Sequence, residues 1–302
     1  MERPEVSNAR ALKLQEGSST QSKSSRLKES KMGYILKTDD NARLRLGIQN
    51  RLYEQSSVDL ISRAGMLRGR KILEVGCGSG AMTLHLARAA GPQGTVTAID
   101  CSQTQLEASR QFVTESGFEN VTFLEGDVNC LDHLENLYDL VYCRMVLHHV
   151  ADADHAIRQM VNVLGPDGHL LCEEPAIHDG SFSFPPSEAI DEFIGKLRSC
   201  FRMSNRDYKI AFRMEAVIRN LGLKIEHSRL NHPLLNSPDE KLLYAMSLRD
   251  LAPQMIKNGV IDLSSVSTLH EKLADLANSE TTMTWARMHS VLARKPHGTE
   301  PH

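Results

Sequence analysis

The chain has 302 residues, of which 41% are hydrophobic and 24% are charged, and its formal net charge is −3. This is the composition of a globular protein that can bury one large core, or a core with a subdomain. The near balance of charge gives no indication of a nucleic-acid partner or an anionic membrane surface. No apolar run approaches the roughly 18 residues of a membrane-spanning helix, and no apolar segment typical of a secretory signal lies near the beginning.

The cysteines and histidines indicate neither a metal centre nor a disulfide framework. None of the six cysteines forms a Cys-x-x-Cys pair, and the thirteen histidines lack a matching ligand spacing. Most of the cysteines lie in apolar runs or tight turns, where they act as small hydrophobic residues. We therefore expect a reduced, cytoplasmic protein without a bound metal.

The first part of the chain differs in texture from the rest. Residues 1–32 are rich in Ser, Lys, Arg, Gln and Glu and lack apolar periodicity, which predicts a disordered tail. From Leu44 to Tyr53, apolar residues recur at helical spacing, and a further apolar group continues to Gly65. This pattern predicts a helix before the main domain.

From Lys71 onward, short apolar strands alternate with helical patterns. Such alternation predicts a parallel sheet built from right-handed β-α-β units. The expected strands are Lys71–Val75, Thr95–Ile99, Val121–Leu124, Leu140–Cys143 and His169–Glu173. The expected helices between them are Ala81–Ala90, Gln103–Ser116, Asp132–Asn136 and Ala153–Leu164.

Beyond Pro175 the alternation breaks, and two helical stripes run from Ile190 to Phe201 and from Ile210 to Leu221. Pro at the first position of a helix is pre-set for helical geometry, so Ser237-Pro238 predicts a further helix. The remaining expected elements are a strand at Leu223–Glu226, a helix near Ser264–Ala277 and a closing strand at Trp285–Arg294.

A glycine loop, Gly76-Cys-Gly78-Ser-Gly80, lies between the first strand and the first helix. Its glycines permit positive φ and a close backbone approach to a ligand, and the helix that follows offers free N–H groups. A nucleotide-like ligand at this strand end is therefore expected. With Ala81 in the third position, the loop also satisfies the dinucleotide fingerprint, so an NAD-dependent oxidoreductase stays open here.

Three acidic residues around this loop separate the two interpretations. Asp100 ends the second strand, where a carboxylate can accept both ribose hydroxyls of either cofactor. Asp127 follows the third strand and could accept an adenine amino group, with backbone contacts from Val128; its alternative role is to cap a short helix. Glu74 suits a free α-amino group and has no use beside a diphosphate. Together they favour adenosine joined to an amino acid.

From about Gly33 to Pro296, the sequence resembles the class I S-adenosylmethionine-dependent methyltransferases. Within that class it is most similar to small-molecule enzymes of the ubiquinone/menaquinone-biosynthesis type. The residues that carry the resemblance are Ile72–Gly80, Val96–Asp100, Leu124–Asp127, Tyr138–His149 and Val163–His169.

The resemblance implies S-adenosyl-L-methionine as the cofactor and assigns residues to its parts. Glu74 is one of the cofactor residues. The others are Gly76, Gly78 and Gly80, which would line the methionine portion, Cys143 and Arg144, which would face the same portion, Asp100 at the ribose, and Asp127 and Val128 at the adenine. Gln49 and Tyr53 could lie over the cofactor, with ordinary helix packing as the alternative.

His148 and His149 follow the fourth strand at the ligand edge of the sheet. One of them, His149 in our prediction, is the best available base for an acceptor hydroxyl or protonated amine. The alternative is that they only hold the loop before the next helix.

The predicted fold class is α/β: a Rossmann-like, doubly wound, mostly parallel seven-stranded sheet, with helical insertions near the C-terminus forming a lid. The expected parts are a tail at 1–32, a helical cap at 33–66, the cofactor-binding core at 67–177, a helical lid at 178–222, the last strands with a second insertion at 223–296, and a tail at 297–302. Five of the eight phenylalanines lie between residues 182 and 212, which favours an apolar lid over the acceptor, although plain packing explains the same pattern.

The predicted function is transfer of a methyl group to an oxygen or nitrogen of an apolar or aromatic small molecule. The alternatives are a regulatory protein that binds the cofactor without transfer, and the NAD-dependent oxidoreductase. We expect no nucleic-acid or membrane partner, and a homodimer is one option for the assembly.

Overall fold

The computed structural model describes residues 40–134, 137–176, 181–204 and 206–297. Contacts divide the chain into two units, Met1–Tyr34 and Ile35–His302, and every described residue belongs to the second. The predicted tail at 1–32 therefore lies outside the described residues.

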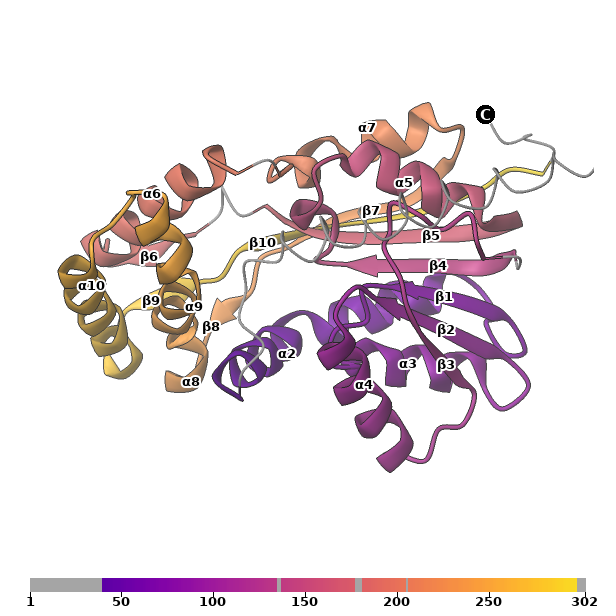
Figure 1. Ribbon diagram of the computed structural model, residues 1–302, viewed down its shortest axis with the longest axis horizontal. Helices are drawn as coiled ribbons and strands as arrows, with labels where there is room; N and C mark the ends of the chain where they lie inside the picture. The colour runs from indigo at the N-terminus through magenta and orange to yellow at the C-terminus, as the bar shows by residue number, and fades with distance from the viewer. Residues whose placement is uncertain (1–39, 135–136, 177–180, 205, 298–302) are drawn as a thin grey trace, which may run out of the picture. The chain divides into compact units, whose positions relative to one another are not determined.

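The second unit is built on a seven-stranded sheet in the order β3-β2-β1-β4-β5-β10-β7 (Figure 1). Neighbours from β3 to β5 pair in parallel, whereas β10 runs antiparallel to both β5 and β7. The predicted fold class is therefore confirmed. The strands are β1 Lys71–Val75, β2 Thr95–Asp100, β3 Val121–Glu125, β4 Tyr138–Arg144, β5 Leu164–Ala176, β7 Lys224–Asn231 and β10 Arg287–Arg294.

Helices cover both faces of this sheet, as right-handed crossovers require. In Figure 1, α3 and α4 lie on one face, and α5 and α7 lie on the other. The central strands are thus buried on both sides, which explains why they are nearly continuous apolar runs. The helices around the sheet are α2 Asp40–Arg63, α3 Ala81–Ala90, α4 Gln103–Glu115, α5 Ala153–Asn162 and α7 Ile210–Asn220.

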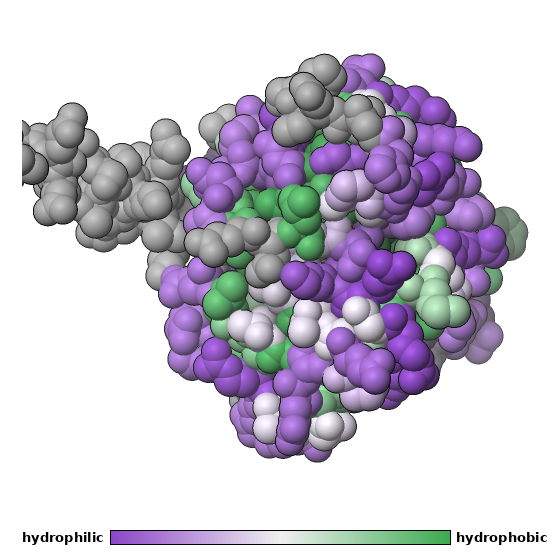
Figure 2. All heavy atoms as spheres, turned by 90° about the vertical axis from the view of Figure 1, so that its right-hand side faces the viewer, coloured by the Kyte–Doolittle hydropathy of each residue, from purple (hydrophilic) through white to green (hydrophobic). Residues whose placement is uncertain are grey.

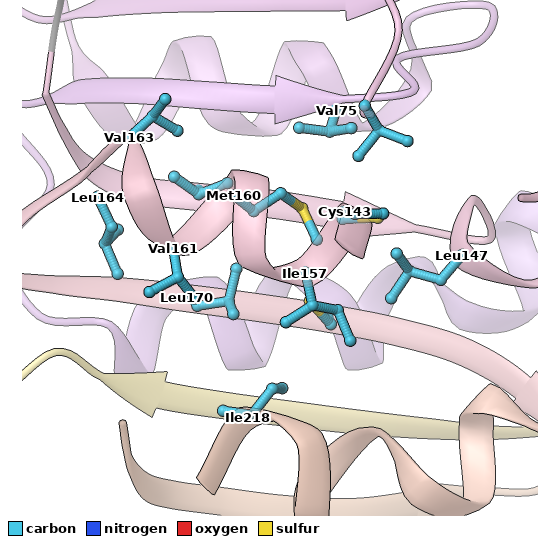
Figure 3. Close-up of a cluster of buried hydrophobic side chains, with 14 of the residues drawn as sticks. Val75, Cys143, Leu147, Ile157, Met160, Val161, Val163, Leu164, Leu170 and Ile218 are labelled. Atoms are coloured by element: carbon cyan, nitrogen blue, oxygen red, sulfur yellow. The ribbon is translucent and has the colours of Figure 1, made fainter. Parts of the chain in front are cut away.

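One hydrophobic core lies between the sheet and α5 with α7. Val75 of β1, Cys143 of β4 and Leu170 of β5 face Ile157 and Met160 of α5 there (Figure 3). Tyr142 and Leu171, next to Cys143 and Leu170, point to the opposite face, because side chains alternate along a strand, and they belong to a core that includes α3. The two cores fix which side of each strand is available at its end.

A further core joins inserted helices to α2. Ile48 and Tyr53 of α2 are buried in it together with Phe193, Tyr244 and Trp285. The Tyr244 ring meets Phe193 edge to face at 5.9 Å and Trp285 edge to face at 4.9 Å, a favourable geometry for aromatic pairs. We call α6, α8, α9 and α10 the lid helices; they span Glu188–Arg202, Pro238–Lys241, Leu243–Lys257 and Leu263–Asp275.

Some predicted boundaries differ from the structure. The helix expected at Asp132–Asn136 is wrong in its described part, where a turn at 132–133 stands instead. Five residues cannot offset the cost of helix nucleation without packing. β5 begins at Leu164, and its pairing with β4 shifts register between Tyr138 and Leu140.

A small three-stranded sheet, β6-β9-β8, was not predicted from the sequence. Its strands have two or three residues each, too few to show an alternating pattern. They are β6 Ser183–Phe184, β8 Leu234–Leu235 and β9 Thr282–Thr284. This sheet brings segments from both insertions together beside the lid helices (Figure 1).

The side at which the parallel strands begin is mainly polar. Figure 2 views the molecule from that side, and hydrophilic residues predominate there, with apolar residues scattered between them. Across the described ranges, no helix has the length and apolarity to cross a membrane. Nor do three or more His, Cys, Asp or Glu of those ranges form a group suited to a metal ion.

The aromatic core of the lid helices gives a stability prediction. Phe193 is 1% exposed, whereas Phe212 on α7 is 56% exposed. Phe193→Ala should lower the free energy of unfolding by about 3–5 kcal/mol through lost burial and an added cavity. Phe212→Ala, the matched control, should change it by less than about 0.5 kcal/mol. Urea unfolding of both variants checks this, and equal losses would contradict the assignment of Phe193 to the core.

Candidate active site

The glycine loop has room for a ligand on one side only. Gly76 has φ +72°, and a Cβ there would lie 2.2 Å from Val146 Cγ2. Gly80 has φ +88°, and its Cβ would lie 2.5 Å from Ser109 Oγ. A Cβ on Gly78, by contrast, would meet nothing within 4 Å. Two glycines are thus required by the packing of the protein itself, and the third faces open space.

Asp100, at the end of β2, holds this loop in place. Its carboxylate accepts hydrogen bonds from the Gly78 N–H and the Ser102 N–H, both at 2.9 Å. Burial raises the pKa of this carboxyl, and the backbone donors counteract part of that effect. The loop of β1 and the acidic end of β2 therefore form one unit.

Glu74 lies directly below the loop and is 2% exposed. Thr83 Oγ1 donates to its Oε2 at 2.6 Å. Burial raises the pKa of Glu74 to about 8, while the Thr83 hydrogen bond and the Arg144 charge oppose the rise. A cation placed beside this carboxyl would favour its ionised form.

Asp127 lies at the end of β3, the outer neighbour of β2. Its Oδ1 accepts hydrogen bonds from both the backbone N–H and the side-chain amide of Asn129, at 2.9 Å each. This is the turn-capping geometry that an Asp often adopts in loops. The side chain of Val128 is buried in the core under α5, so only its backbone is available to a ligand.

The loop after β4, residues 145–150, is organised by Glu174 at the end of β5. Glu174 Oε1 accepts from the N–H groups of Val146 and Leu147, both at 2.8 Å. Oε2 accepts from the N–H of His148 at 3.3 Å and pairs with its Nδ1 at 2.6 Å. This carboxylate therefore sets the path of a loop that belongs to a different strand.

Glu174 and the adjacent Glu173 received no role from sequence reasoning. Both are fully buried, and Glu173 accepts hydrogen bonds from Tyr142 at 2.9 Å and Ser290 at 2.7 Å. The signal that could have found them is two successive carboxylates inside an apolar strand, since buried charges need several partners.

Arg144, the last residue of β4, ties α2 to the sheet. Its guanidinium donates to Ser57 Oγ at 3.2 Å and to Asn50 Oδ1. One turn before Tyr53, Gln49 donates to Met145 Sδ at 3.1 Å. Gln49 and Arg144 thus lie where α2 crosses the strand end.

Two predicted site residues point elsewhere. Tyr53 is buried in the core of the lid helices, and its hydroxyl donates to the carbonyl of Ala286, so the packing alternative describes its side chain. The Cys143 side chain lies in the core under α5 (Figure 3). Only its backbone can line a site at the strand end.

His149 accepts a hydrogen bond that fixes its tautomer. Arg206 Nη1 lies 3.3 Å from His149 Nδ1, and because a guanidinium only donates, Nδ1 must carry the lone pair. Burial lowers the pKa of His149 well below 6.5, and the charges of His148, Arg206 and Arg45 act in the same direction. His149 is therefore neutral at neutral pH.

Comparisons with known proteins identify the family of the chain. Residues 67–228, more than half of the chain, match a family model described as a methyltransferase domain. The chain is 34% identical over 116 residues to a demethylmenaquinone methyltransferase of Anoxybacillus flavithermus, covering 38% of this chain and 49% of that protein. It is 30% identical over 135 residues to the ubiquinone/menaquinone biosynthesis C-methyltransferase UbiE of Hahella chejuensis, covering 44% and 53%.

These alignments span about half the length of the curated relatives. Among solved structures, the chain is similar to a Bacillus halodurans protein described as a methyltransferase. The TM-score is 0.53 at 19% identity, over 80% of this chain and 99% of that one. That likeness concerns the fold.

The raised pKa of Glu74 predicts a pH effect on stability. Its folded value of about 8 exceeds the ordinary value of 4.5, so the folded state holds a proton that the unfolded chain releases. The stability contributed by protonated Glu74 is full below about pH 4.5 and is lost as the pH rises through about 8. Glu74→Gln cannot ionise and should become more stable relative to wild type as the pH rises across this window.

Urea unfolding at several pH values measures this difference. Glu107→Gln, an exposed carboxyl on α4, is the matched control and should follow the wild-type curve. Parallel curves for wild type and Glu74→Gln would show that Glu74 is ionised in the folded protein.

Proposed function

The chain belongs to the class I S-adenosylmethionine-dependent methyltransferases, and we propose that it transfers a methyl group from this cofactor to a small-molecule acceptor. The observation that carries the proposal is the unit formed by Glu74, the glycine loop and Asp100 at the ends of β1 and β2. It offers two carboxylates and an open glycine, which is what an adenosine joined to an amino acid requires.

The chemistry of these groups fits S-adenosylmethionine. Gly76, Gly78 and Gly80 would line the methionine portion, where the open side of Gly78 leaves space. Asp100 would accept the ribose hydroxyls, and Glu74 would accept the α-ammonium group. That cation would lower the pKa of Glu74 and supply the buried carboxylate with a second partner.

Further contacts come from neighbouring strand ends. Asp127 and the backbone of Val128 would hold the adenine. For this, the Asp127 carboxylate must either accept the adenine amino group in addition to the hydrogen bonds from Asn129 or release Asn129. The backbone of Cys143 and the guanidinium of Arg144 would border the methionine portion. Gln49 on α2 would approach from above, while Tyr53 serves to pack α2 against the lid helices.

The cofactor, when bound, supplies a methyl group that is already electrophilic because it is attached to a sulfonium. The protein therefore has to align the acceptor and exclude water, and such positioning is worth roughly 7–11 kcal/mol. The loop after β4 contributes to both tasks, because it contacts the glycine loop and the core of the lid helices. Met145 packs against the core of the lid helices, and Val146 packs against Gly76.

We assign the lid helices to the acceptor side. Their core contains α2 residues and is in contact with Met145, which directly follows Arg144. The buried aromatic residues Phe193 and Phe201 stabilise this layer rather than line a pocket. An apolar or aromatic acceptor fits an apolar layer of this kind.

His149 is the base in this proposal. A neutral imidazole can accept a proton, and burial together with neighbouring cations keeps His149 neutral. The transfer goes to an oxygen or nitrogen, from which His149 removes the proton. A ring carbon is the second candidate, because one relative is named as a C-methyltransferase.

The experiment that tests the function uses the full chain and S-adenosylmethionine with an isotopically labelled methyl group. Demethylmenaquinol, catechols, phenols and aromatic amines are offered separately as acceptors. Labelled product supports the proposal, and mass spectrometry with NMR identifies the methylated atom. Binding of S-adenosylhomocysteine without transfer to any acceptor would favour the regulatory alternative.

Asp100→Asn should weaken S-adenosylhomocysteine binding at least about tenfold, because hydrogen bonds to a charged group contribute about 1.5–3 kcal/mol. Isothermal titration calorimetry measures the dissociation constant. Asp139→Asn is the matched control, since Asp139 is a partly exposed carboxyl near the start of β4, at the other end of the strand from Arg144. Unchanged affinity in Asp100→Asn would remove Asp100 from the ribose site.

His149→Asn should lower turnover by about 10²–10⁴-fold and leave S-adenosylhomocysteine affinity nearly intact, because a base acts on the acceptor. Since the pKa of His149 lies well below 6.5, wild-type activity should decline only when the pH falls into the acid range. His155→Asn, an exposed histidine on α5, controls for histidine loss. Equal turnover in His149→Asn and wild type would refute this role.

A further inference from the structure

The acceptor side carries a group of hydrogen-bond donors that are only partly used. Arg45 lies on α2, four residues before Gln49, and is 3% exposed. Its Nε donates to Asp250 Oδ2 at 2.7 Å and its Nη1 to Gln49 Oε1 at 3.0 Å. Its Nη2 is buried and has no partner among the residues that the structure describes.

An unpaired buried donor of this kind is costly and rare. Leaving it unsatisfied destabilises the folded protein, and the effect is larger for a charged group. Native proteins keep such atoms mainly where a ligand or another group completes them. The Nη2 of Arg45 therefore offers a hydrogen-bond donor to an acceptor atom of a ligand.

A second guanidinium, that of Arg206, contacts His149 directly. Arg206, just before α7, is half-buried and donates to His149 Nδ1. Since Nδ1 is the acceptor in this contact, the proton of the neutral ring is on Nε2. The guanidiniums of Arg45 and Arg206 and the Nε2 of His149 therefore all carry N–H groups that can donate a hydrogen bond to a ligand. The charges of both arginines reach the His149 ring and lower its pKa.

The nearby carboxylates are already engaged. Asp250 accepts from Arg45 and, at 3.3 Å, from Arg249 on α9. Glu174 is saturated by the loop after β4 and by the His148 ring. An anionic group of a ligand would therefore meet N–H donors of Arg45 and Arg206 that the carboxylates of the described residues do not fully occupy.

We propose that the methyl acceptor is an aromatic acid whose carboxylate binds Arg206 and the free Nη2 of Arg45. A planar carboxylate matches the fork of N–H groups on a guanidinium. This inference rests on the proposed function, since it names the class of acceptor for the same site.

The inference also gives Arg206 a positioning role for His149. In the structure, Arg206 occupies the only lone pair of the His149 ring. When Arg206 turns to the carboxylate of the acceptor, that lone pair is released to take a proton. Binding of an acid would then prepare the base, and a neutral analogue would leave it covered.

The test compares aromatic acids with their amides. 3-Hydroxybenzoate and 6-hydroxy-2-naphthoate are each titrated beside the corresponding primary amide, in the presence of saturating S-adenosylhomocysteine, by calorimetry. Wild type should bind at least one acid about tenfold more tightly than its amide. Arg206→Gln should reduce this preference to less than about threefold.

Arg202→Gln is the matched control, because Arg202 is an exposed arginine at the end of α6 that donates to Ser199. It should keep the wild-type preference. The proposal is overturned if no acid is preferred, if Arg206→Gln retains the preference, or if Arg202→Gln loses it equally. Affinity for S-adenosylhomocysteine, measured first on every protein, tests the proposed function separately.

A second measurement follows the His149 ring directly by NMR titration of ¹³C-labelled histidine. Arg206→Gln should raise the pKa of His149, because a neighbouring cation has been removed. In wild type, the preferred acid should raise it as well, and the amide should not. A His149 pKa that is unaffected by the variant and by the acid would contradict the role of Arg206.

Discussion

The site depends on the buried carboxylate of Glu174. A carboxyl group in a protein core is costly to bury unless several donors surround it, and Glu174 receives three backbone N–H groups and an imidazole. These bonds hold the loop after β4, in which Met145 has φ +59°. They place Val146 against Gly76 and His149 beside Arg206. A single residue of β5 thus connects the glycine loop to the acceptor side.

The sequence predicted the elements whose signals are local. β1 and α3 match the expected ranges, because a short apolar run, a glycine loop and a periodic helix follow one another without interruption. Strands that form only by pairing with segments distant in the sequence were not predicted. The strands β6, β8 and β9 acquire their structure from partners up to about a hundred residues away, and a two-residue strand has no period of its own.

The same distinction applies to the site. The glycine loop and Asp100 follow from residues close in sequence, whereas the contact of Arg45 with Asp250 spans 205 positions. No local pattern indicates such a pair. Side-chain direction is equally non-local, because the face of a strand or helix that is buried depends on what packs against it. For that reason Tyr53 was placed correctly along α2 but packs into the core of the lid helices.

Charged groups from several elements surround the site, and their arrangement suits the proposed chemistry. The acidic groups Glu74 and Asp100 lie at the ends of β1 and β2, on the side where a cationic sulfonium cofactor would bind. The guanidiniums of Arg45 and Arg206 lie on α2 and before α7, and Arg206 donates to His149 of the loop after β4. A sulfonium held by the acidic groups and a carboxylate held by these two arginines would attract each other. Because the charges act in a partly desolvated space, their interaction is stronger than in water, and it favours approach of the acceptor toward the methyl group.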